Sequence, residues 1–318
     1  MISSARATQR PGGVAAAAQL FAALFDDAGL FPPQEATMPD ALRAHASHRS
    51  SPHAFLQGTF VVPARRLAEL LTTARDFSER LHLSVVVDYG DLDGAAPAAR
   101  SALTNAPRSS IDANAFELRL PRADVPLRDL EAACVELQAL ASDPASSRIF
   151  LESARMNASL GEAEALAATV TALRKSVPAF VGAKLRTGGL TSDALPASET
   201  VARFVAAMRD RGVAWKATAG LHHPIRGVYG GLEMHGFLNV LVAALGAHVH
   251  ALDAAALVEI LDDTHADDFR LSSVELAWRG MAFDTAAIGA MRGDALQSIG
   301  SCSLDEPVEG LRELGMLA

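Results

Sequence analysis

The chain has 318 residues, of which 50% are apolar and 20% are charged, so it can bury a large core and is not a disordered protein. Its formal charge is −9 and it has no Lys/Arg-rich run, which argues against binding to nucleic acid or to an anionic membrane surface. Cys134 and Cys302 are far apart and form no C-x-x-C pair, so we expect a reducing, cytoplasmic location. The sequence allows a homo-oligomer.

The predicted elements begin with a flexible tail, residues 1–13, and an amphipathic helix, Val14–Phe25, that Asp26 ends. Short β-like runs then alternate with Ala- and Leu-rich helical runs. The predicted strands are Gly58–Val62, Leu83–Asp88, Phe116–Leu120, Arg148–Ser153, Phe180–Arg186, Val213–Thr218 and Gln297–Cys302. The predicted helices are Ala64–Leu81, Leu127–Ala141, Gly161–Ser176, Glu199–Gly212, Phe237–Leu245 and Asp305–Leu314. The Ala/Pro/Ser-rich segment Gly94–Pro107 is predicted to be a surface loop or an excursion between a strand and a helix, with a domain boundary as the alternative.

This alternation predicts an α/β fold with a parallel sheet covered by helices. We predict a single (β/α)8 TIM-like barrel over residues 1–318, extended at its start by the N-terminal helix. The eighth strand would lie in Leu271–Ala282, where apolar residues partly alternate. A doubly wound open sheet is the alternative, and the lack of a G-x-G-x-x-G or P-loop motif disfavours it.

Strand parity places charged residues inside the predicted barrel. Lys184 and Arg186 share one strand face, the apolar residues between them share the other, and Lys216 repeats the pattern on the next strand. Glu152 ends an earlier strand with the same parity. Because catalytic groups of this fold collect at the carboxyl ends of the strands, we expect these four side chains at one mouth of the barrel.

The use of lysine strengthens this prediction. The chain has three lysines, Lys175, Lys184 and Lys216, so arginine supplies nearly all the surface cations. An amine can become neutral and attack a carbonyl, whereas a guanidinium cannot readily lose its proton. Repulsion between two neighbouring ammonium groups would lower the pKa of one of them. A snorkelling or ion-paired lysine is the structural alternative at each position.

Three local motifs resemble the deoxyribose-phosphate aldolase group of class I, Schiff-base aldolases. They are Lys184-Leu185-Arg186-Thr187-Gly188, followed by Gly189; Lys216-Ala217-Thr218-Ala219-Gly220; and Ile299-Gly300-Ser301-Cys302-Ser303. The resemblance covers about fifteen residues and implies that Lys184 forms the Schiff base, that Lys216 lowers its pKa and that the Gly300 loop holds phosphate. The sequence separation between Lys216 and Gly300 is longer than in that family, so an extra β/α unit or an insertion must intervene. The family's assisting aspartate has no match here, and Glu152 is our candidate for its role.

Histidines follow the second lysine strand. His222 and His223 come after Gly220 and Leu221, and His235 follows twelve residues after His223. We expect 221–236 to cross the mouth of the barrel, where these imidazoles would move protons, bind a divalent metal with Glu152, or hydrogen-bond loop carbonyls. Gly300, Ser301 and Ser303 precede a helix and would either cradle an anion or cap that helix.

Three functions therefore remain open. The first is a lyase or aldolase acting on a small anionic metabolite, in which Lys184 forms an imine, Glu152, His222 or His223 moves protons, and no cofactor is required. Its anion would be bound by Arg186, Thr187, Gly188, Gly189, Gly300, Ser301 and Ser303. The second is a metal-dependent lyase, isomerase or hydrolase that uses His222, His223 and His235. The third is a binding barrel without catalysis.

Overall fold

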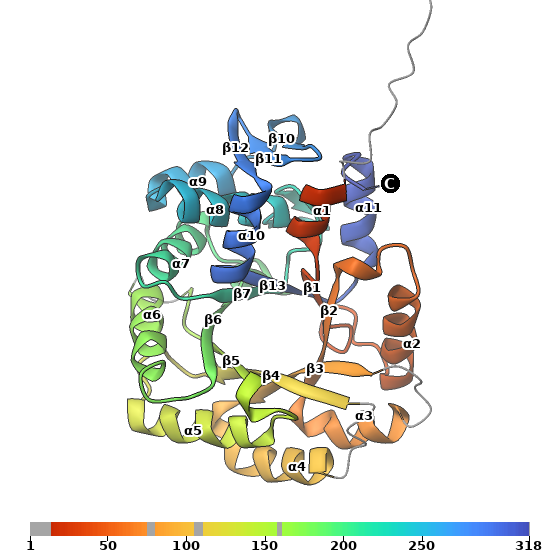
Figure 1. The fold of residues 1–318 in the computed structure, drawn as a ribbon, viewed down its shortest axis with the longest axis vertical. Coiled ribbons are helices and arrows are strands. Elements are labelled where there is room, and N and C mark those ends of the chain that lie inside the picture. The colour runs from red at the N-terminus through yellow and green to blue at the C-terminus, as the bar shows by residue number, and fades with distance from the viewer. Residues whose placement is uncertain (1–13, 75–79, 105–110, 158–160, 318) are drawn as a thin grey trace, which may run out of the picture.

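The computed structural model describes residues 14–74, 80–104, 111–157 and 161–317. The tail predicted for residues 1–13 lies outside these ranges. Eight parallel strands close into a barrel (Figure 1), in the order β1-β2-β3-β4-β5-β6-β7-β13 around the ring. Their bounds are β1 Phe25–Asp27, β2 Gln57–Pro63, β3 Leu81–Asp88, β4 Ile111–Leu120, β5 Arg148–Ser153, β6 Phe180–Arg186, β7 Trp215–Thr218 and β13 Leu296–Ser301. The predicted TIM-like (β/α)8 fold is confirmed.

Helices surround the ring of strands (Figure 1). Those that follow the strands are α2 Met38–Arg49, α3 Leu67–Thr73, α4 Leu92–Thr104, α5 Leu127–Leu140, α6 Glu162–Leu173, α7 Ser198–Asp210 and α11 Asp305–Glu313. A further helix, α1 Val14–Phe21, precedes the barrel. Among the described residues no helix combines the length and apolar character needed to cross a membrane.

The prediction that the eighth strand of the barrel lies in Leu271–Ala282 is wrong. The eighth strand is β1, whose three residues follow α1 and close the barrel between β2 and β13. The segment Leu271–Ala282 instead contributes to an antiparallel sheet of β10 Phe269–Leu271, β11 Glu275–Trp278 and β12 Met281–Asp284. This sheet lies outside the ring, at the top of Figure 1. A three-residue strand is too short to show an apolar periodicity in the sequence. Its place becomes evident only in the closed barrel.

A long insertion separates β7 from β13, as the spacing of the motifs required. It contains a β-hairpin, two helices, the antiparallel sheet and a third helix. Its remaining elements are β8 Gly227–Tyr229, β9 Leu232–Met234, α8 Phe237–His250, α9 Ala254–Leu261 and α10 Thr285–Asp294.

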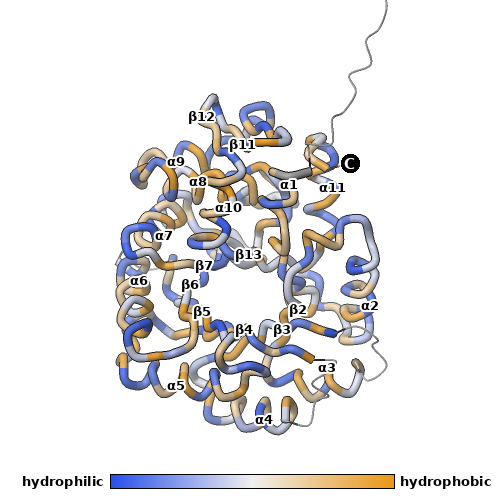
Figure 2. Tube along the Cα trace, in the orientation of Figure 1, coloured by the Kyte–Doolittle hydropathy of each residue, from blue (hydrophilic) through white to orange (hydrophobic). Residues whose placement is uncertain are grey.

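The segment predicted to be a loop, Gly94–Pro107, is largely helical. Residues 92–104 form α4, with Pro97 inside it, and residues 105–107 lie outside the described ranges. Pro97 is the sixth residue of α4 and lacks the N–H of one helical hydrogen bond, but the many alanines still favour the helix. Figure 2 shows that α4 and α5 carry both hydrophobic and hydrophilic stretches, as expected of helices that pack on one side only.

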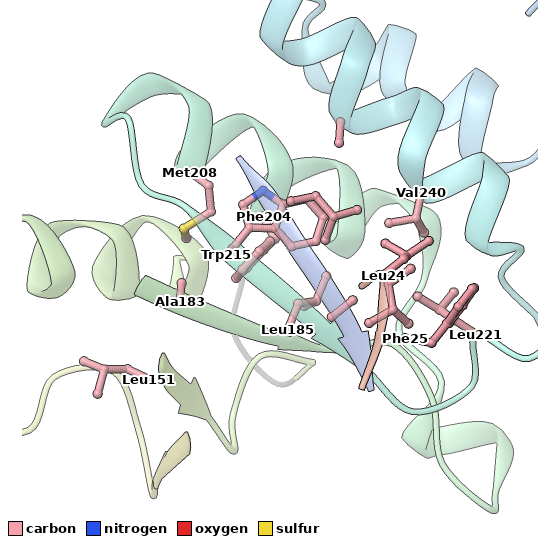
Figure 3. Packing of buried hydrophobic residues seen from close by; sticks show 14 of the residues in the cluster. Leu24, Phe25, Leu151, Ala183, Leu185, Phe204, Met208, Trp215, Leu221 and Val240 are labelled. Carbon is pink, nitrogen blue, oxygen red and sulfur yellow. The ribbon is translucent and has the colours of Figure 1, made fainter. Parts of the chain in front are cut away.

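The main core lies between the strands and the helices. Ala183 and Leu185 of β6 and Trp215 of β7 point outward to this layer (Figure 3), where Trp215 meets Phe204 of α7 at a ring-centroid distance of 5.4 Å. Burying each large apolar side chain of this kind stabilises the fold by about 1.5–3 kcal/mol. Because successive strand residues alternate, this outward apolar face leaves Lys184 and Lys216 facing the barrel interior.

Two glycines hold the ends of β6 and β7 in close contact. A Cβ added to Gly188 would lie 2.6 Å from Cα of Gly220, which is backbone and cannot rotate away. Gly220 itself has a φ of +75°. The loops that carry the cavity mouth therefore approach each other only because both residues lack a side chain.

We predict that Gly188→Ala lowers the free energy of unfolding by about 1–3 kcal/mol, because the clash forces a backbone shift. The matched control is Gly94→Ala in α4, where an added Cβ meets nothing within 4 Å. That variant should be stabilised by about 0.5–1 kcal/mol through helix propensity. Urea unfolding of the two variants measures both effects, and equal stability of the pair would refute the close approach.

Candidate active site

The predicted inward-facing charges lie on three neighbouring strands. Lys184 of β6 is in register with Glu152 of β5 on one side and with Lys216 of β7 on the other. All three residues are buried, with 2–3% of their surface exposed. Strand parity therefore located this part of the site from the sequence.

A carboxylate that the sequence analysis missed joins the two lysines. Glu117 of β4 lies 2.6 Å from Lys184 Nζ through Oε2 and 2.6 Å from Lys216 Nζ through Oε1. Ser84 of β3 donates a hydrogen bond of 2.7 Å to the same Oε1. The single negative charge of Glu117 thus lies between two ammonium groups and offsets their mutual repulsion.

Each lysine also has a second carboxylate. Lys184 Nζ lies 2.6 Å from Glu152 Oε2, and Lys216 Nζ donates to Asp26 Oδ2 at 2.6 Å. Asp26 is fixed in turn by Ser298 Oγ at 2.6 Å and by the backbone N–H and hydroxyl of Thr59, each at 2.8 Å. The residue predicted only to end the first helix is therefore a buried partner of Lys216.

The charges determine the pKa values of this network. Burial alone raises the pKa of Glu117, but the ammonium groups of Lys184 and Lys216 outweigh burial and hold that pKa below its ordinary value of 4.5. Burial likewise opposes the charge of Lys216, but Asp26 and Glu117 raise its pKa above the ordinary 10.5. The pKa of Lys216 is thus raised because carboxylates surround it.

A cavity of about 830 Å³ opens above this network at the carboxyl ends of the strands. Lys184, Glu117 and Glu152 line it, whereas Lys216 is absent from its lining. Lys216 instead has its Nζ 5.5 Å from the centroid of the Phe150 ring, below the cavity. Lys184 therefore reaches the cavity, whereas Lys216 lies beneath it.

The opposite wall of the cavity carries an apolar patch. Ala28, Val61 and Val86 form a small buried cluster separate from the main core, with Phe31 packed against it. These residues also line the cavity. A ligand would thus contact charged groups on one side and hydrocarbon on the other.

Arginines lie at the rim beside Glu152. Arg186 donates to Glu152 Oε1 at 3.0 Å, and Arg119 lies 3.7 Å from the same oxygen while pairing with Asp88 at 3.2 Å. Burial raises the pKa of Glu152, but Lys184, Arg186 and Arg119 outweigh it and lower that pKa to about 2. Side chains of both arginines remain 35–40% exposed, so they can also face a bound anion.

The other predicted anion-binding residues are largely engaged within the protein. Thr187 donates its hydroxyl to the carbonyls of Thr218 and Ala219. Ser301 donates to the Ser303 carbonyl at 2.6 Å, and Ser303 Oγ accepts from the backbone N–H of Asp305 at 3.2 Å. Gly189 and Gly300 do line the cavity.

The segment 221–236 crosses the cavity mouth, but its three histidines do not lie together. His222 and His223 line the cavity together with Tyr229, on which His223 stacks at a centroid distance of 3.5 Å. His235 is buried elsewhere, where its ring meets the Pro196 carbonyl at 2.8 Å and Arg226 at 3.0 Å. The predicted three-histidine metal site is not formed, because the β8–β9 hairpin turns His235 into the packing against the loop before α7.

A different group of side chains lies at the rim near His222. Its Nδ1 is 2.9 Å from Glu306 Oε2 and 3.8 Å from Cys302 Sγ. Burial, assisted by Glu306, raises the pKa of Cys302 to about 11. The uncoordinated thiol is therefore protonated at neutral pH and is a weak nucleophile.

One of the two residues missed had a usable signal in the sequence. Glu117 has inward parity on a strand that was predicted, because Phe116, Leu118 and Leu120 form the apolar outward face of that strand. Asp26 had no such signal, because its strand has three residues.

Comparison of the sequence with protein-family models and with curated proteins gives no match. The resemblance to class I aldolases therefore rests on the three local motifs alone.

We predict that Glu117→Gln lowers the free energy of unfolding by about 3–5 kcal/mol, because it leaves two buried ammonium groups short of a counter-charge. The control is Glu69→Gln, which breaks an exposed ion pair with Arg66 and should cost at most about 1 kcal/mol. Denaturant unfolding at neutral pH compares the two. Similarly small losses of unfolding free energy for both variants would show that the charged side chains inside the barrel are well solvated.

The lowered pKa of Glu152 also predicts how stability depends on pH. A carboxyl whose pKa is lower in the folded state stabilises the fold above its unfolded pKa and loses that contribution as the pH falls. The loss should run from about pH 4.5 to about pH 2 and amount to roughly 3 kcal/mol at about 1.36 kcal/mol per pKa unit. Glu152→Gln should flatten this part of the curve of unfolding free energy against pH, and an unchanged curve would contradict the pairing.

Proposed function

We propose that this protein is a lysine-dependent lyase that forms a Schiff base between Lys184 and a small carbonyl compound bearing a carboxylate or phosphate. The observation that carries the proposal is the position of Lys184, a buried amine that lines the cavity between Glu117 and Glu152. This reaction needs no cofactor.

Arg119 and Arg186 are the groups that would bind the anionic end of the substrate. Both lie beside Glu152 at the cavity rim and remain partly exposed. When a substrate anion engages them, their attraction for Glu152 is shared, so the pKa of Glu152 rises. Glu152 then becomes a better acceptor for the proton that Lys184 must lose before it attacks.

The reaction then follows from amine chemistry. Lys184 Nζ adds to the carbonyl carbon, and water leaves to give an iminium ion. The bond between the α and β carbons then breaks: its electron pair moves toward the iminium, while Glu152 or Glu117 takes the proton of the β-hydroxyl. This yields an enamine and a carbonyl fragment. Glu152 or Glu117 in its acid form returns a proton to the enamine carbon, and water hydrolyses the imine to release the second product.

Lys216 has a supporting role in this proposal. It is held as an ammonium by Asp26 and Glu117 and fixes the carboxylate that faces Lys184. Glu117 supplies the assisting carboxylate for which the sequence had no match. The resemblance to deoxyribose-phosphate aldolases supports the assignment of Lys184, whereas the carbon skeleton of the substrate is not transferred from that family.

The alternative of a non-catalytic binding barrel requires the same arginines but no reactive amine. A neutral, attacking lysine separates the two functions, and it can be trapped chemically.

We predict that borohydride reduction in the presence of a panel of anionic aldehydes and keto acids attaches one fragment per chain, at Lys184. Intact-protein mass spectrometry followed by peptide mapping locates the adduct. The chain supplies its own control, because Lys175 is exposed and reports non-specific alkylation. Lys184→Arg should abolish the specific adduct, since a guanidinium cannot form the imine.

An adduct found at Lys216 would reverse the assigned roles. Labelling confined to Lys175 and the amino terminus, at the same level with every carbonyl compound, would refute the Schiff-base function.

A further inference from the structure

We infer that His222, Cys302 and Glu306 bind one divalent transition-metal ion of the zinc type at the rim of the cavity. Each offers one ligand atom, and the three ligand atoms lie within 4.8 Å of one another. This inference does not depend on the chemistry proposed for Lys184.

The donor atoms fit such an ion. An imidazole nitrogen, a thiolate sulfur and a carboxylate oxygen are all zinc ligands, whereas magnesium and calcium prefer oxygen alone. With bonds of about 2.0–2.3 Å, ligand atoms of a tetrahedral zinc site lie about 3.3–3.6 Å apart. The distances here are 2.9 Å between His222 and Glu306 and 3.8 Å between His222 and Cys302, so small side-chain rotations suffice.

The fold brings the three ligands from separate elements to one place. Cys302 follows β13, His222 follows the tight exit of β7 at Gly220, and Glu306 lies in the first turn of α11. Packing holds the His222 loop on that helix, because an added Cβ at Gly310 of α11 would lie 2.6 Å from Pro224 Cδ. The stacking of His223 on Tyr229 fixes the other side of the same loop.

Three protein ligands leave a fourth position open, which is the pattern of catalytic rather than structural zinc sites. All three residues line the same cavity as Lys184. A metal here could therefore coordinate an oxygen of the bound ligand, on the side of the cavity away from the arginines. The site would thus orient a hydroxyl, carbonyl or carboxylate group from a second direction.

A second group of potential ligands, Asp263, His265 and Asp268, is already satisfied. Arg279 pairs with Asp263 at 3.1 Å and with Asp268 at 2.7 Å, and Trp278 donates to Asp263 at 2.8 Å. This second group has no thiol, so a thiolate-to-metal absorption band distinguishes metal bound at Cys302 from metal bound there.

The test is cobalt(II) titration of the purified, metal-stripped full-length protein, followed by absorption spectroscopy without any substrate. We expect a thiolate-to-cobalt charge-transfer band that saturates at one cobalt per chain and that zinc abolishes by competition. Cys302→Ser should lose the band. Glu306→Gln and His222→Ala should weaken cobalt binding by roughly 10–100-fold or more, since even outer-shell partners of a metal contribute that much.

The matched control is Cys134→Ser, which removes the chain's other cysteine, buried in α5, and should leave the band unchanged. Circular dichroism checks that each variant is folded. The inference is overturned by absence of a thiolate band at millimolar cobalt, by a band that survives Cys302→Ser, or by unchanged affinity in Glu306→Gln. None of these results bears on borohydride trapping at Lys184, so the two proposals fail separately.

Discussion

The arrangement of the barrel interior depends on the carboxylate of Glu117, which lies between the ammonium groups of Lys184 and Lys216. Each buried ion costs several kcal/mol to remove from water, so ions in the lumen must be paired and hydrogen-bonded. Asp26 and Glu152 complete the pairing of the lysines. The interior is thus held by matched charges where most barrels of this fold pack branched aliphatic side chains.

The two lysines of this network have different surroundings. Lys216 is enclosed by Asp26, Glu117 and the ring of Phe150, and an added Cβ at Gly182 would lie 2.9 Å from that ring. The missing side chain at Gly182 therefore makes room for the aromatic ring. As a result, Lys184 alone of the pair lines the cavity.

The cavity has three chemically distinct sides. The strands β1 to β3 contribute hydrocarbon through Ala28, Val61 and Val86, and arginines stand beside Glu152 on the next strands. The loops after β7 and β13 contribute imidazole, thiol and carboxylate groups. A ligand that satisfies all three sides is small, partly apolar and anionic, and carries a further oxygen.

The sequence alone determined the barrel class and the inward positions of Glu152, Lys184 and Lys216, because strand alternation is a local property that parity counting reads directly. Glu117 was open to the same counting but went unnoticed. Only the tertiary structure placed Asp26, whose three-residue strand exists because the sheet must close. It also decided that His235 turns away while Cys302 and Glu306 join His222. Residues up to 84 positions apart meet there, and such contacts are set by loop packing, which leaves no periodic signal in the chain.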